Sequence, residues 1–506
     1  MRLTDSQHMY AADCAAINER GIPGAALMKN AARAVAEAAL RYTAPGGTAC
    51  AFCGSGNNGG DGIGAAAELL RAGVRVRVFL VGRRESMSGD SREMERELIS
   101  LGGRLEAFDP GAPGLNEYLQ TADVIIDALF GIGLSREVDG IYETAVKLIN
   151  ASGRPVVAAD IPSGVCADTG EILRCAVAAA ETVTFSMAKP GHFAEPGCTC
   201  CGRVTVADIG IPRDLIDNAG TDTYAVTDGD VSLPRRPALS HKGDYGRLLI
   251  LGGSVGYTGA PTLCARAAVR AGAGLVHLGV PESIYGITAV KNDEAMPFPL
   301  PEKDGKLAPD AISALERVSG AQVLAAGPGM GRSEGTAALT RRIAEGCALP
   351  MVLDADALYA LAQDMSVLRR AKGTIVLTPH EMEYRRMGGD VRGGRVQSAR
   401  AFAQEHGCIL VLKGHRTLAA FPDGEVYIAT RGNPGMAKGG TGDVLTGILA
   451  AMLCQLEPKR AVITAMHLHA LCGDLCRSRL GEYAMTASDI IETLPEATKM
   501  IIKEQK

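Results

Sequence analysis

Tryptophan is absent from this chain of 506 residues, and all aromatic residues together make up only 4% of it. No uninterrupted apolar run approaches the length of a membrane span, and the first residues, which include Arg2 and Asp5, lack the apolar core of a signal peptide. Neither sign of charge dominates, because the formal net charge is −5 and the pI is near 6.1. We therefore expect a cytoplasmic protein that binds neither membranes nor nucleic acid.

The fourteen cysteines also lack the spacing of a usual zinc site. Cys198, Cys200 and Cys201 are too close together, and no second pair follows at a standard distance. A second group of potential ligands lies on one apolar helical run and spreads over more than one helix face: His467, His469, Cys472 and Cys476. We expect reduced, mostly buried cysteines and interpret the second group as helix packing.

The chain is rich in small and aliphatic residues. Hydrophobic residues make up 47% of it, charged residues 22%, and there are 62 glycines. The length allows two or three domains. This composition is typical of α/β domains with many tight turns near ligands.

The first half alternates helical and strand patterns. Residues 6–42 have helical spacing with an interruption at 21–24, and residues 48–53 predict a short strand. A glycine-rich loop at 54–62 and an Ala/Leu helix through Leu70 follow, which is the phosphate-binding arrangement of nucleotide folds. The Asn and Asp side chains in this loop also suit a cation or sugar hydroxyls, whereas the alternative is a structural asparagine–glycine turn.

Further strands are predicted at 74–81, 123–130, 156–161, 182–186 and 204–209. Polar residues stand at the carboxyl ends of several strands of this half: Asn58, Asp127, Asp160 and Ser163. Because ligands of open parallel sheets bind beyond these ends, the four residues together predict one pocket, although each could be a turn or cap residue. Lys189, between the last two strands, is either a cationic contact to substrate or a solvated loop charge.

The second half repeats the strand–loop–helix rhythm. Strands are predicted at 247–251, 323–326, 351–353, 375–377 and 409–412, each followed by a loop with glycine, Asp, His or Lys. This rhythm predicts a mainly parallel, doubly wound sheet. The stretch 213–244, with its Pro, Gly and charged residues, is expected to connect the halves, and no P-loop motif is present.

Residues 432–447 organise this second half. In the sequence GNPGMAKGGTGDVLTG, a glycine-rich turn ends at Gly442, and an apolar helical run begins at Asp443. The free amides of such a helix start, here those of Gly440, Thr441 and Gly442, form an anion site. A carboxylate at this place suits a base that accepts a hydroxyl proton during phosphoryl transfer, whereas the alternative is an ordinary N-cap aspartate.

Several short motifs, taken in their order along the chain, resemble those of a known family. They are GNNGGDG (56–62), DALFGIG (127–133), DIPSG (160–164), HKGDYG (241–246), YTGAP (257–261), GPGMG (327–331), DADAL (354–358), TPH (378–380), LKGH (412–415) and GGTGD (439–443). The chain is similar over nearly its whole length to the two-domain repair enzymes for hydrated NADH and NADPH. These join an epimerase to an ADP-dependent dehydratase.

The resemblance implies two α/β domains, both with three layers and mainly parallel sheets. Residues 1–218 would form a Rossmann-like epimerase domain that interconverts the R and S hydrates at carbon 6 of the nicotinamide. Residues 225–506 would form a ribokinase-like dehydratase domain that restores NADH or NADPH from the S form, converting ADP to AMP and phosphate. A homo-oligomer is also expected.

The resemblance further implies the site residues. Asp443 and Asp160 would be catalytic, the role of Asp160 as a base being our hypothesis. Residues that would contact substrate are Asn57, Asn58, Gly59, Gly60, Asp61, Gly131, Ile132, Gly133, Leu134, Ser135, Arg136, Glu137, Asp160, Ala260, Gly329, Gly331, His380 and Asp443. The adenine nucleotide, with Mg²⁺, would be held by Lys413, Gly414, His415, Arg416, Thr417 and Gly442. A K⁺ ion would be bound by Asn58, Asp127 and Ser163.

Two other functions stay possible from the sequence. The second half shares its architecture with vitamin and sugar kinases that use ATP, so the fold alone does not exclude a kinase. The Asn-Asn-Gly-Gly-Asp loop argues against it, because a small-molecule kinase has no need of that pocket. A non-enzymatic sensor of nicotinamide dinucleotides is the third hypothesis, and it would leave Asp443 without a task.

Overall fold

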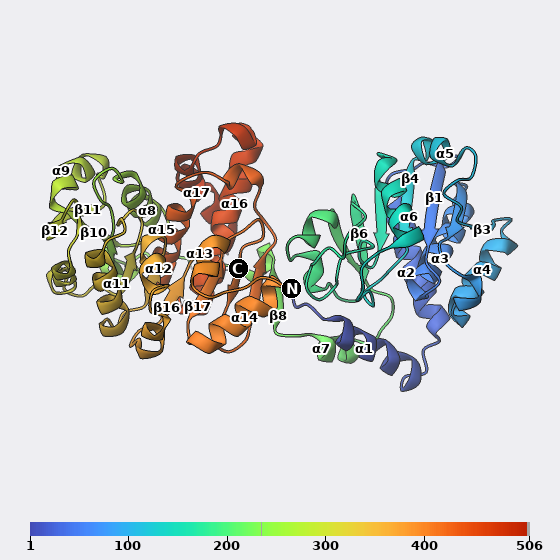
Figure 1. The fold of residues 1–506 in the computed structure, drawn as a ribbon, viewed down its shortest axis with the longest axis horizontal. Helices are drawn as coiled ribbons and strands as arrows, with labels where there is room; N and C mark the ends of the chain where they lie inside the picture. Colours follow the sequence, from blue (N-terminus) through green and yellow to red (C-terminus); the bar gives the residue numbers. More distant parts are fainter. Residues whose placement is uncertain (234, 503–506) are drawn as a thin grey trace. The chain divides into compact units, whose positions relative to one another are not determined.

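A computed structural model describes residues 1–233 and 235–502. The chain folds into two compact units, one formed by Arg2–Thr223 and the other by Met1 with Tyr224–Lys506. Figure 1 follows the chain by colour from the N-terminus to the C-terminus. Among the described residues, none of the helices combines the length and the apolar character that a bilayer span requires.

The unit Arg2–Thr223 contains a seven-stranded parallel sheet with the order β3-β2-β1-β4-β5-β6-β7. This order is Rossmann-like, and it reverses between β1 and β4, where such sheets bind ligands. The strands are β1 Thr48–Cys53, β2 Arg75–Leu80, β3 Leu105–Ala107, β4 Val124–Ala128, β5 Val156–Ala159, β6 Glu181–Phe185 and β7 Arg203–Ala207. All strands predicted in the first half are present, and β3 was not predicted.

Helices cover both faces of this sheet (Figure 1). They are α1 Ser6–Asn18, α2 Gly24–Ala39, α3 Asn57–Arg71, α4 Gly89–Ser100, α5 Leu115–Thr121, α6 Gly140–Ala151 and α7 Arg213–Ala219. The residues of β1 alternate between two cores: Ala49, Ala51 and Cys53 pack with α1 to α4, whereas Cys50 and Phe52 pack with α5 and α6. Because successive strand residues point to opposite faces, a strand buried on both faces is apolar throughout.

Two predicted boundaries were wrong. The helix after β1 begins at Asn57, so the glycine-rich motif forms the first turns of α3 instead of a loop before it. Gly59 and Gly60 permit this, since a β-carbon at Gly59 would lie 1.8 Å from the Gly54 carbonyl oxygen and one at Gly60 2.6 Å from Met28 Sδ. The stretch 213–244 is not only a connection, because α7 and β8, Thr223–Val226, lie within it.

The second unit is built on a ten-stranded sheet with the order β11-β10-β9-β14-β15-β16-β17-β18-β19-β8. The strands from β11 to β17 pair in parallel, and β17, β18 and β19 pair antiparallel. Besides β8 they are β9 Arg247–Leu251, β10 Leu275–Pro281, β11 Met296–Leu300, β14 Val323–Ala326, β15 Met351–Leu353, β16 Ile375–Leu377, β17 Ile409–Leu412, β18 Leu418–Ala420 and β19 Val426–Ala429. Glu302–Lys303 (β12) and Lys306–Leu307 (β13) form a separate hairpin. The five predicted strands are confirmed.

Helices again complete a three-layer α/β unit of ribokinase-like class. They are α8 Gly259–Arg270, α9 Glu282–Lys291, α10 Ala314–Arg317, α11 Glu334–Gly346, α12 Asp356–Leu361, α13 Glu381–Arg386, α14 Arg395–His406, α15 Thr441–Leu453, α16 Pro458–Ala484 and α17 Ala487–Ile501. In β9, Leu248 and Ile250 belong to the core formed with α8, α15, α16 and α17, whereas Leu249 and Leu251 are buried outside that core.

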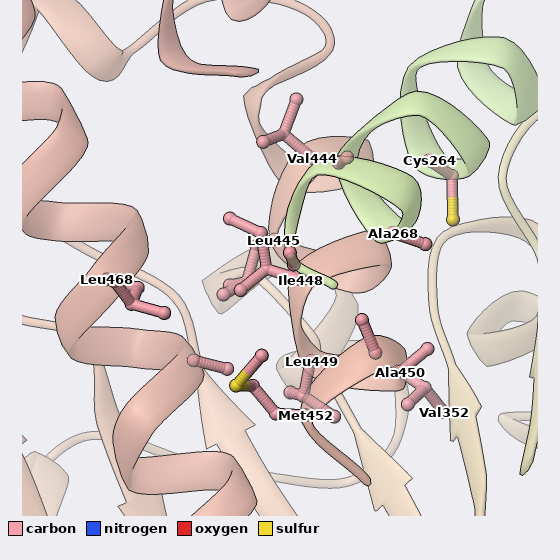
Figure 2. Packing of buried hydrophobic residues seen from close by; sticks show 14 of the residues in the cluster. Cys264, Ala268, Val352, Val444, Leu445, Ile448, Leu449, Ala450, Met452 and Leu468 are labelled. Atoms are coloured by element: carbon pink, nitrogen blue, oxygen red, sulfur yellow. The ribbon is translucent and has the colours of Figure 1, made fainter. Parts of the chain in front are cut away.

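Helix α15 is anchored by the apolar run that the sequence predicted. Figure 2 shows Val444, Leu445, Ile448, Leu449 and Met452 packed among side chains of α8, α16 and β15. These α15 side chains are at most 2% exposed. Burying such a side chain contributes about 1.5–3 kcal/mol, so this face holds the N-terminus of α15 at one place above the sheet.

Candidate active sites

A cavity of about 900 Å³ lies in the unit Arg2–Thr223. It opens at the carboxyl ends of β1, β4, β5 and β6, and α1 and α2 supply further walls. The predicted residues that line it are Asn57, Asn58, Asp61, Gly131, Ile132, Gly133, Leu134, Ser135, Arg136 and Asp160. Gly59, Gly60, Glu137, Asp127 and Ser163 are not among its lining residues. The fold thus brings these residues together in one pocket at the carboxyl ends of the strands, which is where a parallel sheet is expected to bind a ligand.

Asp160 is the most constrained acid of this cavity. It follows β5 with φ of 63°, a region that L-residues rarely adopt and that is maintained only where the surroundings enforce it. Its Oδ1 accepts hydrogen bonds from Lys189 Nζ at 2.6 Å and Thr184 Oγ1 at 2.9 Å. Its carbonyl oxygen lies 2.8 Å from His192 Nε2. These contacts fix the carboxylate at the cavity wall.

Lys189 is not the solvated loop charge that the sequence left open. Its side chain is 0% exposed, and its Nζ also donates to Thr184 Oγ1 and to the Phe185 carbonyl oxygen. A buried ammonium needs such a set of acceptors, because an unpaired charge in the interior is very costly. Lys189 also lines the cavity, so it lies both beside Asp160 and at the pocket wall.

The ionisation of the cavity acids differs with their partners. Burial acts to raise the pKa of Asp160, but the charge and hydrogen bond of Lys189 outweigh it and lower the pKa. Burial, with the charges of Asp160 and Asp13, raises the pKa of Asp61 well above its usual range. Burial also raises the pKa of Asp13 to about 6, Lys189 acting against this shift. The cavity therefore contains one carboxyl that holds its charge more firmly, Asp160, and two that bind a proton more readily, Asp61 and Asp13.

The predicted K⁺ ligands all lie close to the loop that follows β4. Ser163 Oγ donates to Asp127 Oδ1 at 2.6 Å, and the Ser163 amide donates to Oδ2 at 2.8 Å. The Phe130 amide donates to Ser163 Oγ at 2.9 Å, and a β-carbon at the next residue, Gly131, would lie 3.2 Å from the Asn58 carboxamide. Burial raises the pKa of Asp127 to about 6, hydrogen bonds from Ser163 acting against this. The three predicted ligands thus surround one short loop.

In the second unit, Asp443 lies in the first turn of α15, after Gly440 with φ of 98°. Its side chain is half-buried and makes no hydrogen bond or ion pair with residues 1–233 or 235–502. Burial raises its pKa to about 7, with a further contribution from Asp354 and an opposing one from Lys413. The Thr441 amide donates to the Lys438 carbonyl at 3.4 Å, so it is not free as predicted. Asp443 is therefore an unpaired acid at the helix start, and its role as a base stays a prediction.

A buried ion pair lies beneath this helix start. Lys413, after β17, donates from Nζ to Asp354 Oδ1 at 2.8 Å, and Thr446 of α15 donates to Asp354 Oδ2 at 2.7 Å. A β-carbon at Gly442 would come 3.4 Å from Lys413 Nζ. Asp354 is only 1% exposed, and it ties the carboxyl end of β15 to α15 and to Lys413. The positively charged Lys413 side chain is therefore held directly beside Gly442, one of the glycines of the predicted anion site.

The other residues predicted for this site gather at neighbouring strand ends. A β-carbon at Gly329 would lie 3.2 Å from Ala260 Cβ, and the Gly331 amide donates to Asp356 at 2.8 Å. His380 forms a parallel bridge with Lys413, and its Nδ1 accepts from the amides of Met382 and Glu383. The remaining nucleotide residues follow Lys413: Gly414, His415, Arg416 and Thr417, of which Arg416 donates to the Thr430 carbonyl. Their roles in binding stay predictions.

Comparison with known proteins gives the family of this chain. Residues 24–191 match the model of the YjeF-related protein N-terminus, and residues 248–496 match that of NAD(P)H-hydrate dehydratase. A bifunctional NAD(P)H-hydrate repair enzyme of Moorella thermoacetica is 41% identical over 518 aligned residues, which cover 100% of this chain and 98% of the relative. The chain belongs to the family of bifunctional NAD(P)H-hydrate repair enzymes.

Other members of the repair-enzyme family and a solved structure are also similar. The bifunctional enzyme of Thermofilum pendens is 37% identical, with 97% of this chain and 94% of the relative covered. The crystal structure of ADP/ATP-dependent NAD(P)H-hydrate dehydratase from Bacillus subtilis, crystallised with ATP and Mg²⁺, is 32% identical. The match covers 54% of this chain and 97% of that one, with a TM-score of 0.47. The two family models match separate units, so this repair enzyme carries its two candidate sites in different domains.

The residues suspected as metal ligands have other surroundings in this repair enzyme. None of the fourteen cysteines, all of which lie within the described residues, forms a disulfide, and no group of three His, Cys, Asp or Glu side chains in this part of the chain is arranged to hold a metal. His469 lies on α16 as predicted, and its Nε2 is 3.0 Å from the Thr441 carbonyl oxygen. Burial lowers its pKa to about 4, so the neutral ring contacts the first turn of α15. The sequence did not predict this link to the Asp443 site.

Two acids of the sites, Asp13 and Asp354, were not predicted from the sequence. Asp13 occupies an alanine-rich helix outside every quoted motif, and no local pattern distinguishes it from a surface residue. Asp354 was quoted within DADAL but received no role. Its position at a strand end, two residues before a second aspartate, was the signal that could have found it.

Proposed function

We propose that this chain repairs hydrated NADH and NADPH. The unit Arg2–Thr223 interconverts the R and S epimers at carbon 6, and the unit Tyr224–Lys506 dehydrates the S form at the expense of ADP. The observation that carries the proposal is the unpaired Asp443 beside Lys413 and Gly442. We further propose that the substrates are small molecules and that Mg²⁺ accompanies ADP, where it would neutralise phosphate charge.

The dehydration requires a better leaving group than hydroxide. Asp443 accepts the proton of the carbon-6 hydroxyl while that oxygen attacks the terminal phosphoryl group of ADP, and AMP leaves. The amides of Gly440 and Gly442 and the ammonium of Lys413 stabilise the charge on the transferred group. Loss of a proton from carbon 5 and of phosphate from carbon 6 then restores the dihydronicotinamide ring. An absorbance assay of this ring, with the S hydrate and ADP, tests the function directly, and no recovery would refute it.

The raised pKa of Asp443 predicts the pH dependence of dehydration. Below about pH 7 this carboxyl is increasingly protonated and cannot accept the hydroxyl proton, so the rate should fall as the pH decreases. Asp354→Asn removes a negative charge that raises this pKa, and the midpoint should shift to lower pH. The measurement is kcat/KM against pH for both proteins. An unchanged midpoint in the variant would show that another group controls the profile.

For the epimerase unit, the donor set fits K⁺. Asp127 and Ser163 present buried carboxylate and hydroxyl oxygens, and hard oxygen donors of this kind suit alkali and alkaline-earth cations. Asn58 Nδ2 is buried without a hydrogen-bond partner among the described residues, and a flipped carboxamide would place its oxygen there instead. Asn58, Asp127 and Ser163 would hold the ion, which would keep Asp127 ionised and order the loop at 129–131.

Removal of K⁺ should therefore weaken the epimerase unit. Exchange of K⁺ for tetramethylammonium, which is too large for the site, is expected to lower both the epimerisation rate and the melting temperature of this unit. A hundredfold excess of K⁺ over its Kd corresponds to about 2.7 kcal/mol of stabilisation. Asp127→Asn should abolish the response, and calorimetry of the whole chain measures it. Equal melting in both salts would contradict the site.

A further inference from the structure

Asp13 is a carboxyl for which the fold provides no partner. It lies on α1, and its side chain lines the cavity of the unit Arg2–Thr223. Its Oδ1 atom is buried and has no hydrogen-bond partner in the described part of the chain. Such atoms are rare in folded proteins, because a buried polar group without a hydrogen-bond partner loses its interactions with water and gains nothing in return. Packing of α1 therefore does not account for an aspartate at this position.

The charges around Asp13 come from several elements. Asp160 and Lys189 act on it from the loops after β5 and β6, and it interacts with Asp61 of α3. Tyr10 and Cys14 of α1 are its titratable neighbours that also line the cavity. Helix α7, which packs on α1, contributes charges that pair within α7 or with a residue just after α1: Arg213 with Asp217, and Asp214 with Arg20. Asp13 is thus coupled to the one carboxylate that Lys189 holds ionised.

The two acids are suited to opposite tasks. Lys189 and Thr184 occupy Asp160 Oδ1 and stabilise its charged form. Asp13 has no such donor, and burial favours its neutral form, with a pKa of about 6. Pairs of titratable groups whose surroundings separate their pKa values are the usual acid and base of an active site. Asp13 is the acid of this pair.

We propose that Asp13 is a catalytic residue of the epimerase site and acts as the acid–base partner of Asp160. This inference rests on the proposed epimerase function. Asp13 donates its proton to the carbon-6 hydroxyl. The C–O bond then breaks, and the electron pair of this bond leaves with the released water. The lone pair of the ring nitrogen forms a C=N bond to carbon 6. Water then adds to the other face of carbon 6, and its surplus proton passes to Asp160.

The reverse conversion uses the same two groups with their roles exchanged. Asp160, now protonated, expels the hydroxyl of the new epimer, and Asp13 accepts the proton when water adds to the first face. Each conversion releases one water, adds one water, and moves one proton from one carboxyl to the other. No other reactant is needed. A single proton shared by two carboxyls therefore suffices for both directions.

The test is Asp13→Asn in the full chain, with epimer exchange followed by chromatographic separation of the two hydrates. Loss of a general acid is expected to lower the exchange rate about 10²–10⁴-fold. The wild-type rate, corrected for uncatalysed exchange, should fall as the pH rises through about 6, where Asp13 loses its proton, and this limb should be absent in the variant. Glu19→Gln, at the end of α1 and outside the cavity, is the control and should keep the wild-type rate and profile.

The outcomes separate this inference from the proposed function. Absence of exchange by the wild-type chain would refute the epimerase function itself. Wild-type exchange together with an unchanged rate and pH limb in Asp13→Asn would overturn only the role of Asp13. As a second variant, Asp13→Ala should regain exchange when formate is added, because formate replaces the missing carboxyl. Failure of formate to restore any rate in a folded Asp13→Ala protein would also overturn the role.

Discussion

Asp443→Asn is expected to abolish the ADP-dependent recovery of dihydronicotinamide absorbance from the S hydrate. An amide cannot accept the hydroxyl proton, and general-base catalysis is worth about 10²–10⁴-fold in rate. The substitution preserves the shape of the side chain, and Asp443 forms no hydrogen bond or ion pair with residues 1–233 or 235–502 that would be lost. The apolar face of α15 is also unchanged, so the unit should stay folded. The rate of absorbance recovery measures the effect.

Two comparisons make this prediction specific. Epimer exchange by the Asp443→Asn chain should equal that of the wild type, because the cavity lies in the other unit. Glu316→Gln, an exposed carboxyl of α10, should leave absorbance recovery unchanged. Recovery at the wild-type rate by Asp443→Asn would remove the base from the mechanism and with it the chemical basis of the dehydratase.

Lys189→Met is expected to have the second large effect, on the epimerase unit alone. It leaves Asp160 buried without its cation, and breaking a buried ion pair by removing one partner typically costs about 3–5 kcal/mol. The pKa of Asp160 should rise, since the interaction that lowers it is gone, and epimer exchange should fall with it. Calorimetry of the full chain and the exchange assay measure the two effects.

The control for charge removal is Lys147→Met. Lys147 pairs with Glu143 at 2.8 Å, but its side chain is 70% exposed, and such surface pairs contribute about 0–1 kcal/mol. The double variant Lys189→Met with Asp160→Asn should regain part of the lost stability, because no unpaired charge remains, but not the exchange activity. If Lys189→Met melted like Lys147→Met, the buried pair would not be the support that the contacts indicate.

Many of the strands and some of the helices could be predicted from local pattern, whereas β3, β8, β10, β11, β18 and β19 were not predicted. Residues 48–53 and 409–412, for example, are short apolar runs bounded by glycine, and each is a buried parallel strand. The boundaries failed where tertiary contact outweighs propensity. Asn57 begins α3 although Asn and Gly are weak helix formers, because Gly59 and Gly60 allow the helix to approach Gly54 and Met28.

The motifs likewise predicted where ligands bind, since parallel strands deliver their loops to one edge of a sheet. Asn58, Asp61 and Asp160 meet at one cavity for this reason. Asp443 stands at the start of α15 because a glycine turn precedes an apolar helical run, which is a local property of the sequence. Family resemblance added the reaction and the candidate ligands.

The chain's own sequence thus determined its two α/β halves, the edges where ligands bind and the acid at the helix start, because these follow from hydrophobic period and from the neighbours along the chain. Only the tertiary structure decided which charges meet. Lys189 pairs with Asp160 across 29 residues of sequence, and Lys413 pairs with Asp354 across 59. Asp13 lines the same cavity as Asp160, although the two are even further apart in the sequence. The pKa of a carboxyl depends on burial and on charges a few ångströms away, and neither can be read from residues that are adjacent only in sequence.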